Sequence, residues 1–149
     1  MSLTTEVVNE NGTLYYYKDG KRTNSAGLIK FDDAYYYIGS GAIAVTNKAA
    51  WIAAGNTYGF AAANYWFGAD GKMSNETMVN QEDGILYYYK NGKRTANAGL
   101  IEFNGAYYYI EGAAKAAVSK RVWISASKSN GLCAEGSYDF DAEGKMIIK

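Results

Sequence analysis

Aromatic residues offer the clearest chemistry in this chain. Its 149 residues include 15 Tyr, 5 Phe and 3 Trp, and aromatic faces stack on flat groups or attract cations. Trp51 and Trp123 stand at equivalent places, 72 residues apart, whereas Trp66 has Asp139 as its counterpart. Each Trp is either a core or hairpin-capping residue or a platform for a sugar ring. All three are therefore candidate ligand-binding residues.

Tyrosine triplets supply a second group of candidates. The sequence YYY occurs four times, and side chains along a strand alternate between its two faces, so the middle residue of a triplet points away from the outer two. Because Asp139 replaces Trp66 at the middle of the third aromatic segment, that face is expected to meet water. Leu14 and Ile38 are apolar on the same face and favour the alternative, packing between neighbouring hairpins. The middle tyrosines, expected to be the more exposed members, are Tyr16, Tyr36, Tyr88 and Tyr108.

Basic residues follow two of the glycine turns. Lys21 and Arg22 come after Asp19-Gly20, and the second copy repeats the pattern. A solvated face is the ordinary interpretation, but Arg side chains also fit the oxygens of phosphate groups. The candidates on this basis are Lys21, Arg22, Lys93 and Arg94.

Residues for catalysis or metal binding are scarce. The chain has no His and a single cysteine, Cys133, and its carboxylate pairs fall in or beside predicted turns, where turn chemistry explains them. Asp139, Asp141 and Glu143 alternate but lack the glycine and bidentate spacing of a calcium loop. We therefore expect no enzyme, no metal and no cofactor.

Charge and composition exclude further classes. Lys and Arg number 15, as do Asp and Glu, so the field that attracts nucleic acid or acidic membranes is weak. No segment has the length or apolarity of a signal-peptide core or a membrane span. Abundant Tyr and Gly, with no Pro, indicate short strands joined by tight turns.

An internal repeat organises the chain. A shift of 72 residues places the first half on the second as far as the tryptophans, and a shift of 73 applies beyond them. The added residue falls near 133–136, which predicts a loop there. The repeat units run from about 5 to 76 and from about 77 to 149, and the chain has the pattern of a piece of a longer array.

Each unit contains three shorter segments with an aromatic cluster, a glycine turn and a second short run. In the first unit they lie at 14–22, 34–44 and 64–73. Asp-Gly and Asn-Gly pairs suit two-residue hairpin turns. We predict an all-β fold of six hairpins, three per unit, stacked as an elongated solenoid. Alanine-rich 42–54 and 112–124 are the rival helical segments, but loop and irregular strand are expected there.

These segments resemble a known family. YWFGADGKM at 65–73 and YDFDAEGKM at 138–146 are similar to the cell-wall-binding repeats of Gram-positive bacterial surface proteins, the superfamily of choline-binding and glucan-binding repeats. GLIKFDDAYYYI and GLIEFNGAYYYI resemble the segment that links one such hairpin to the next. The resemblance implies a β-hairpin solenoid on a secreted or cell-surface protein.

The same resemblance implies three functions, in this order. The first is binding of cell-wall polymer or extracellular polysaccharide, and the second is a structural spacer or protein-interaction array. A choline-dependent anchor comes third, because such repeats carry Trp after the linking glycine, where this chain has Leu28 and Leu100. Tyr, not Trp, also leads the aromatic triplets, so a cation–π cage lacks its usual residues.

Overall fold

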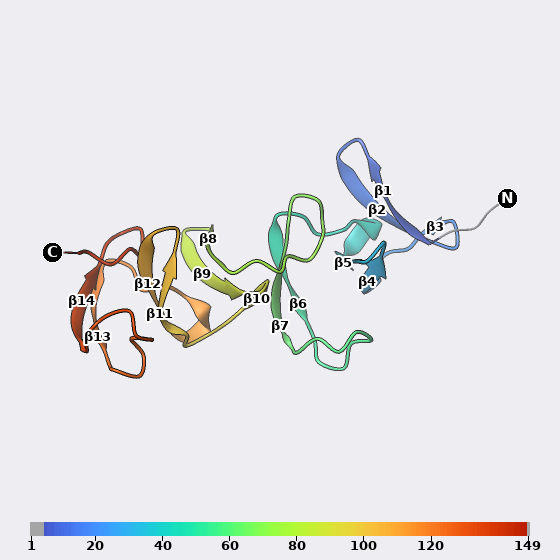
Figure 1. Ribbon diagram of the computed structural model, residues 1–149. Coiled ribbons are helices and arrows are strands. Elements are labelled where there is room, and N and C mark those ends of the chain that lie inside the picture. The colour runs from blue at the N-terminus through green and yellow to red at the C-terminus, as the bar shows by residue number, and fades with distance from the viewer. Residues whose placement is uncertain (1–4, 149) are drawn as a thin grey trace. The chain divides into compact units, whose positions relative to one another are not determined.

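The computed structural model describes residues 5–148 as short antiparallel strands joined by tight turns (Figure 1). Two three-residue 3-10 turns, Ser40–Ala42 and Gly112–Ala114, are the helical segments in that range. The model therefore confirms the all-β class, and it contains no helix long and apolar enough to cross a membrane within residues 5–148.

The contacts divide the chain between Asn75 and Glu76 into two compact parts, here called unit 1 and unit 2. The strands of unit 1 are β1 (Glu6–Glu10), β2 (Thr13–Lys18), β3 (Lys21–Arg22), β4 (Gly27–Phe31), β5 (Ala34–Ile38), β6 (Lys48–Ile52) and β7 (Ala63–Phe67). Those of unit 2 are β8 (Met78–Glu82), β9 (Ile85–Lys90), β10 (Lys93–Arg94), β11 (Gly99–Phe103), β12 (Ala106–Ile110), β13 (Lys120–Ile124) and β14 (Gly136–Phe140).

Within the described residues each unit holds three main hairpins. In unit 1, β1 pairs with β2, β4 with β5 and β6 with β7; in unit 2, β8 pairs with β9, β11 with β12 and β13 with β14. Asn11 and Gly12 turn the first hairpin with φ of 55° and 88°, the pair of positive values that a two-residue turn of this kind requires.

The position of the hairpins corrects the sequence prediction. We expected each aromatic strand to pair mainly with the residues that follow it. Instead, most of its backbone pairing is with the strand that precedes it. The Asp19-Gly20 turn does form, yet it joins β2 only to the two-residue β3. Segments 34–44 and 64–73 each close with a single bridge, Ile38 to Ala44 and Phe67 to Met73. The preceding strands pair along five residues, and this longer ladder of backbone hydrogen bonds makes them the main partners.

Two smaller expectations have different outcomes. The segment GLIKFDDAYYYI, assigned as a link between hairpins, is itself the β4–β5 hairpin, because Asp32 and Asp33 both adopt positive φ and turn the chain. The expectation that 42–54 and 112–124 form no long helix is confirmed, since apart from 3-10 residues at their starts they contain β6 and β13. The loop predicted near 133–136 also forms, since 133–135 end the connection between β13 and β14 and Gly136 begins β14.

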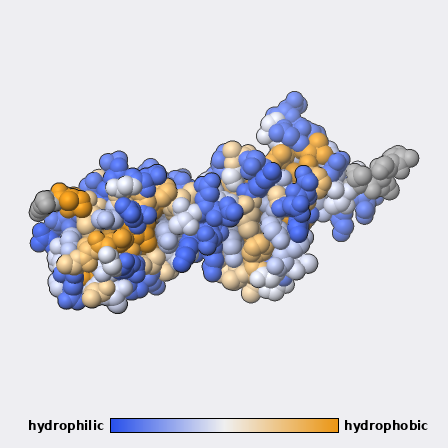
Figure 2. Space-filling view, in the orientation of Figure 1, coloured by the Kyte–Doolittle hydropathy of each residue, from blue (hydrophilic) through white to orange (hydrophobic). Residues whose placement is uncertain are grey.

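Apolar side chains collect between consecutive hairpins of each unit, and Figure 2 shows apolar patches among hydrophilic residues over both units. In unit 1 one cluster lies under the first two hairpins and includes Tyr16, Tyr36 and Ile38, and another lies under the third and includes Tyr65 and Phe67. Unit 2 has the two equivalent clusters, one around Tyr88, Tyr108 and Ile110 and one around Leu100, Ile124 and Phe140.

Glycine turns let the third hairpin's tail approach the others closely. A Cβ on Gly71 would lie 2.6 Å from Leu14 and 3.3 Å from the Tyr36 ring, and one on Gly144 would lie 2.7 Å from Leu86. Both glycines also have positive φ. A larger residue would therefore push the hairpins of a unit apart.

Candidate ligand-binding site

The third hairpin of unit 1 carries tryptophan on its outward face. Ile52, Tyr65 and Phe67 point into the core and are buried, so the alternate positions face away from it. On that face Trp51 lies opposite Asn64, and Ala49 lies opposite Trp66. The two tryptophans are thus diagonal neighbours on adjacent strands. Trp51 is 57% exposed and Trp66 is half-buried.

A pocket of about 280 Å³ opens beside Trp51. Leu28 and Tyr37 form one wall, Trp51 and Ile52 another, and residues 53–56 at the start of the β6–β7 loop form the third. Apolar and aromatic walls with backbone polar groups are typical of ligand sites.

Asn56 fixes the loop that forms this wall. Its Nδ2 donates hydrogen bonds to the Ala53 and Phe60 carbonyl oxygens at 2.9 and 2.8 Å. Its Oδ1 accepts from the backbone N–H groups of Tyr58 and Phe60 at 3.2 and 3.0 Å. One carboxamide therefore satisfies four backbone groups within the loop itself.

Tyr58 attaches the loop to the second hairpin. Its ring packs edge-on against Tyr35 at 5.1 Å between centroids, and its hydroxyl accepts a hydrogen bond from the Lys30 N–H at 3.1 Å. This contact covers the part of β4 at Lys30 and leaves the part at Leu28 beside the pocket.

Unit 2 closes the equivalent space with its own loop. The Lys128 carbonyl oxygen accepts a hydrogen bond from the Leu100 N–H at 2.9 Å, and Asn130 Nδ2 donates to the Ala98 and Leu100 carbonyl oxygens at 2.9 and 2.8 Å. A Cβ on Gly99 would lie 2.6 Å from the Lys128 oxygen. Leu100 is fully buried, but Trp123 remains 60% exposed.

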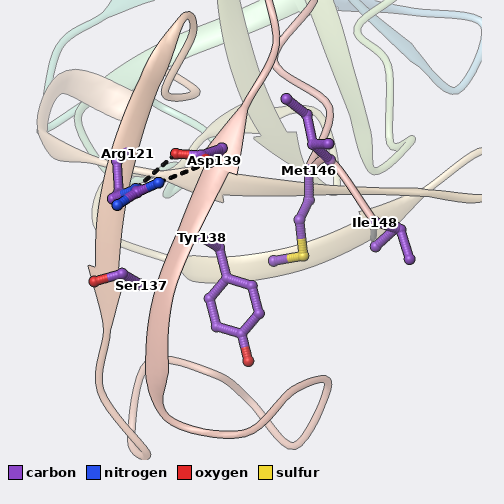
Figure 3. Close-up of a pocket in the computed structure, with 7 residues that line it drawn as sticks. Arg121, Ser137, Tyr138, Asp139, Met146 and Ile148 are labelled. Atoms are coloured by element: carbon purple, nitrogen blue, oxygen red, sulfur yellow. Dashed lines mark hydrogen bonds and ion pairs between the residues drawn. The ribbon is translucent and has the colours of Figure 1, made fainter.

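A different pocket, of about 420 Å³, lies along β14 and the segment that follows it in unit 2 (Figure 3). Arg121 and Asp139 take the positions of Ala49 and Trp66 and face each other across β13 and β14. Arg121 Nε donates to Asp139 Oδ1 at 2.9 Å and Nη2 donates to Oδ2 at 3.2 Å. This paired arrangement raises the pKa of Arg121, chiefly through the hydrogen bond to Asp139. The other lining residues are Ser137, Tyr138, Met146, Ile147 and Ile148.

The expected exposure of the middle tyrosines is wrong. Tyr16, Tyr36 and Tyr88 are each 6% exposed, and Tyr108 is 7% exposed. Their face carries the contact between consecutive hairpins, and burial raises the pKa values of Tyr16, Tyr36 and Tyr88. The apolar residues on that face, Leu14 and Ile38, were the sequence signal for this packing. A role of these four tyrosines in ligand contact stays an untested prediction.

The arginines selected for phosphate binding have partners within their own hairpins. Arg22 stacks on the Tyr15 ring at 3.8 Å, and its Nη2 lies 2.6 Å from Glu10 Oε1. Its Nε donates to the Tyr17 hydroxyl at 3.1 Å, and that hydroxyl donates to Glu10 Oε2 at 2.5 Å. The hydrogen bond from Tyr17, followed by the contacts of Arg22, holds the pKa of Glu10 below its ordinary value despite some desolvation.

Unit 2 repeats this cluster. Arg94 stacks on Tyr87 at 3.7 Å and lies 2.5 Å from Glu82, and its Nε donates to the Tyr89 hydroxyl at 2.9 Å. Sequence reasoning missed these clusters, although Glu10 and Glu82 follow the same 72-residue shift as the two arginines. Phosphate binding by Arg22 and Arg94 is untested, as it is for Lys21, which is exposed, and Lys93, which is half-buried.

Hairpins of this kind, repeated in tandem and packed through aromatic strands, define a β-hairpin repeat module. No family model and no curated protein sequence matches the chain. Among solved structures, the choline-binding domain of CbpL from Streptococcus pneumoniae aligns with 97% of this chain and 78% of its own length, at TM-score 0.51 and 23% identity.

Two other pneumococcal structures are similar over most of this chain. The modular autolysin LytC, solved in complex with a synthetic peptidoglycan ligand, aligns with 96% of this chain and 33% of its own, at TM-score 0.51 and 15% identity. Choline binding protein F aligns with 97% of this chain at TM-score 0.49 and 21% identity, and this chain spans 41% of its length. The likeness to CbpL and LytC shows a shared fold, and it confirms the β-hairpin fold that the resemblance implied.

Proposed function

We propose that this chain is a non-catalytic surface repeat module that binds a cell-wall polymer or extracellular polysaccharide by aromatic stacking. The observation that carries the proposal is Trp51, a large ring left 57% exposed at the rim of a pocket. A core or capping Trp would be covered, because burying such a ring is strongly favourable.

Trp123 supports the same function. It occupies the equivalent strand position and is 60% exposed, although its neighbours Arg121 and Asp139 differ from those of Trp51. Exposure that persists with different neighbours argues that the outward Trp serves something other than packing. Each platform is worth on the order of 1 kcal/mol, so retention on a polymer depends on repetition of weak sites.

The wider organisation is part of the proposal. We propose that the two tandem repeat units, 5–76 and 77–149, belong to a hairpin solenoid in a longer multi-repeat protein that is secreted or held at the cell surface. A partner in the cell wall is supported by the choline-binding domain of CbpL and by LytC, an autolysin solved in complex with a synthetic peptidoglycan ligand. Nucleic acid and inserted membrane are not expected partners, given the balanced charge.

A structural spacer or protein-interaction array is the second candidate. The buried middle tyrosines and the internally paired Arg22 and Arg94 favour it, because both groups make their contacts within the hairpins. A choline-dependent anchor stays third, since Leu28 and Leu100 occupy the positions at which choline-type repeats carry Trp.

A retention assay separates these functions. The protein is mixed with Gram-positive cell walls, before and after removal of teichoic acid, and with insoluble polysaccharides. Trp51→Ala and Trp123→Ala are each expected to lower retention about fivefold, and the double variant more. Val118→Ala removes another exposed apolar side chain and serves as the control.

Each result has a defined meaning. Retention of both Trp variants at the level of Val118→Ala contradicts the stacking proposal and favours the spacer. Loss of binding on removal of teichoic acid, with release by free choline, favours the anchor.

A further inference from the structure

Under the proposed function, the strand edge beside the Trp51 pocket bears on which polymer chemistry the pocket recognises. β4 pairs with β5 on one side and has no second strand neighbour within residues 5–148. Leu28 and Lys30 are two residues apart on β4, so their backbone N–H and C=O groups point to the same edge. Lys30 donates at that edge to the Tyr58 hydroxyl at 3.1 Å. Leu28 therefore presents its N–H and C=O along the free edge as well.

In unit 2, groups of the chain itself bond to the equivalent strand edge, that of β11. Leu100 is the counterpart of Leu28, and its N–H donates to the Lys128 carbonyl oxygen at 2.9 Å. The carbonyl oxygens of Ala98 and Leu100 accept from the Asn130 amide nitrogen at 2.9 and 2.8 Å. The chain thus fills the edge in unit 2 with one amide acceptor and one amide donor of its own. In unit 1 the loop stops short, because Asn56 bonds only to that loop.

The edge at Leu28 also lies beside an exposed aromatic ring. Leu28 and Trp51 line the same pocket of about 280 Å³, and Trp51 is largely exposed. A ligand that supplies an amide to the edge and a flat apolar face to the indole would use both features. A sugar ring with an acetamido substituent has this combination, since the acetamido group contains one N–H donor and one C=O acceptor.

We propose that the Trp51 pocket of unit 1 selects N-acetylated sugars. The ring stacks on Trp51, the acetamido oxygen accepts from the Leu28 N–H, and the acetamido N–H donates to a carbonyl oxygen of the Ala26–Leu28 edge. A peptide would also pair with a free edge, but it makes no use of the flat, exposed indole.

Two matched trimers test this selection. Chitotriose, here the fully N-acetylated trimer, and cellotriose have the same linkage. They differ at C2, where chitotriose carries an acetamido group and cellotriose a hydroxyl. The full chain is titrated with each while backbone amide resonances are followed by NMR. Chitotriose is expected to bind about tenfold more tightly and to shift the Leu28 amide. The Leu100 amide, already bonded to Lys128, is the internal control and should not move.

Variants assign the response to unit 1. Trp51→Ala should abolish the shift of Leu28, and Trp123→Ala should leave it unchanged. Equal affinity for both trimers, or a Trp51 indole shift without a Leu28 shift, overturns the acetamido proposal and leaves polymer binding intact. A Leu28 shift with trialanine and none with chitotriose favours a peptide and overturns it too. No response to sugars or to cell walls overturns the proposed function itself.

Discussion

The loop of the third hairpin lies at the outer edge of the preceding hairpin in both units, but its hydrogen bonds differ between them. The loop of unit 2 bonds to β11 through Lys128 and Asn130, whereas the loop of unit 1 bonds to itself through Asn56 and reaches β4 only at Lys30. Nearly identical hairpins can therefore present either a closed edge or an open pocket, depending on whether an asparagine of the loop bonds to the loop itself or to the preceding hairpin.

The cores beneath the loops provide the strongest test of this comparison. Phe67 is fully buried in unit 1 and Phe140 is 2% exposed in unit 2. If the units differ only in their outward faces, Phe67→Ala and Phe140→Ala should each cost roughly 3 to 5 kcal/mol of unfolding free energy. Denaturant titration of both variants measures it. A loss confined to one variant would show that the cores differ as well.

Much of the fold could be predicted from the sequence, because repeats and turn residues act locally. The 72-residue shift, the Asp-Gly turns and the absence of a long helix at 42–54 all have local causes. The choice of strand partner could not be predicted, since suitable turns connect an aromatic strand to the segments on both sides of it. The partner is the segment that forms the longer ladder of backbone hydrogen bonds.

The candidate site was predicted less well, for a physical reason. Strand alternation identifies two faces but not which of them the next hairpin covers. The change from Trp66 in the first copy to Asp139 in the second suggested that every middle position faces water. The first two hairpins instead bury their middle residues, Tyr16 and Tyr36. The exposed Trp51 and Trp123 were named as candidates. The pocket at Leu28 could not be predicted, because it depends on hydrogen bonds within a loop, which follow no periodic pattern in the sequence.

The loop asparagine of unit 2 is expected to matter next most. Asn130→Ala leaves the carbonyl oxygens of Ala98 and Leu100 without their donor, which should cost about 1 to 2 kcal/mol. Hydrogen exchange of the Leu100 amide should accelerate, because the loop no longer holds Lys128 in place. Asn56→Ala is the matched variant and should accelerate exchange of Tyr58 and Phe60 while leaving Leu100 unchanged. Protection of Leu100 in Asn130→Ala would mean that Lys128 alone closes the edge.

The arginine clusters should differ in a smaller way. The Arg94–Glu82 pair has side chains 21% and 17% exposed, against 48% and 35% for Arg22–Glu10. Arg94→Lys loses the fork geometry and the ring stacking in the less solvated setting, so it should lower stability more than Arg22→Lys. Equal unfolding midpoints for the two variants would contradict this ranking.

Acid should weaken the Glu10 cluster. The folded-state pKa of Glu10 lies below its ordinary value of 4.5, so its contribution to stability is present above that value and is lost as the pH falls through the lowered folded pKa. Glu10→Gln should therefore flatten the acid limb of a plot of stability against pH below about 4.5. An acid limb identical to that of the unmodified chain would show that other carboxylates set it.

The smallest change in stability is expected where the outward faces of the third hairpins are exchanged. Arg121→Ala with Asp139→Trp gives unit 2 the residues of unit 1 at Ala49 and Trp66. The Arg121–Asp139 pair is largely exposed, with side chains 67% and 30% accessible, and exposed pairs contribute little. The unfolding midpoint should stay close to that of the unmodified chain. Retention on polymer should rise, because a second Trp then stands diagonal to Trp123. A large loss of stability would instead assign the ion pair a structural role and make the difference between the two faces a requirement of folding.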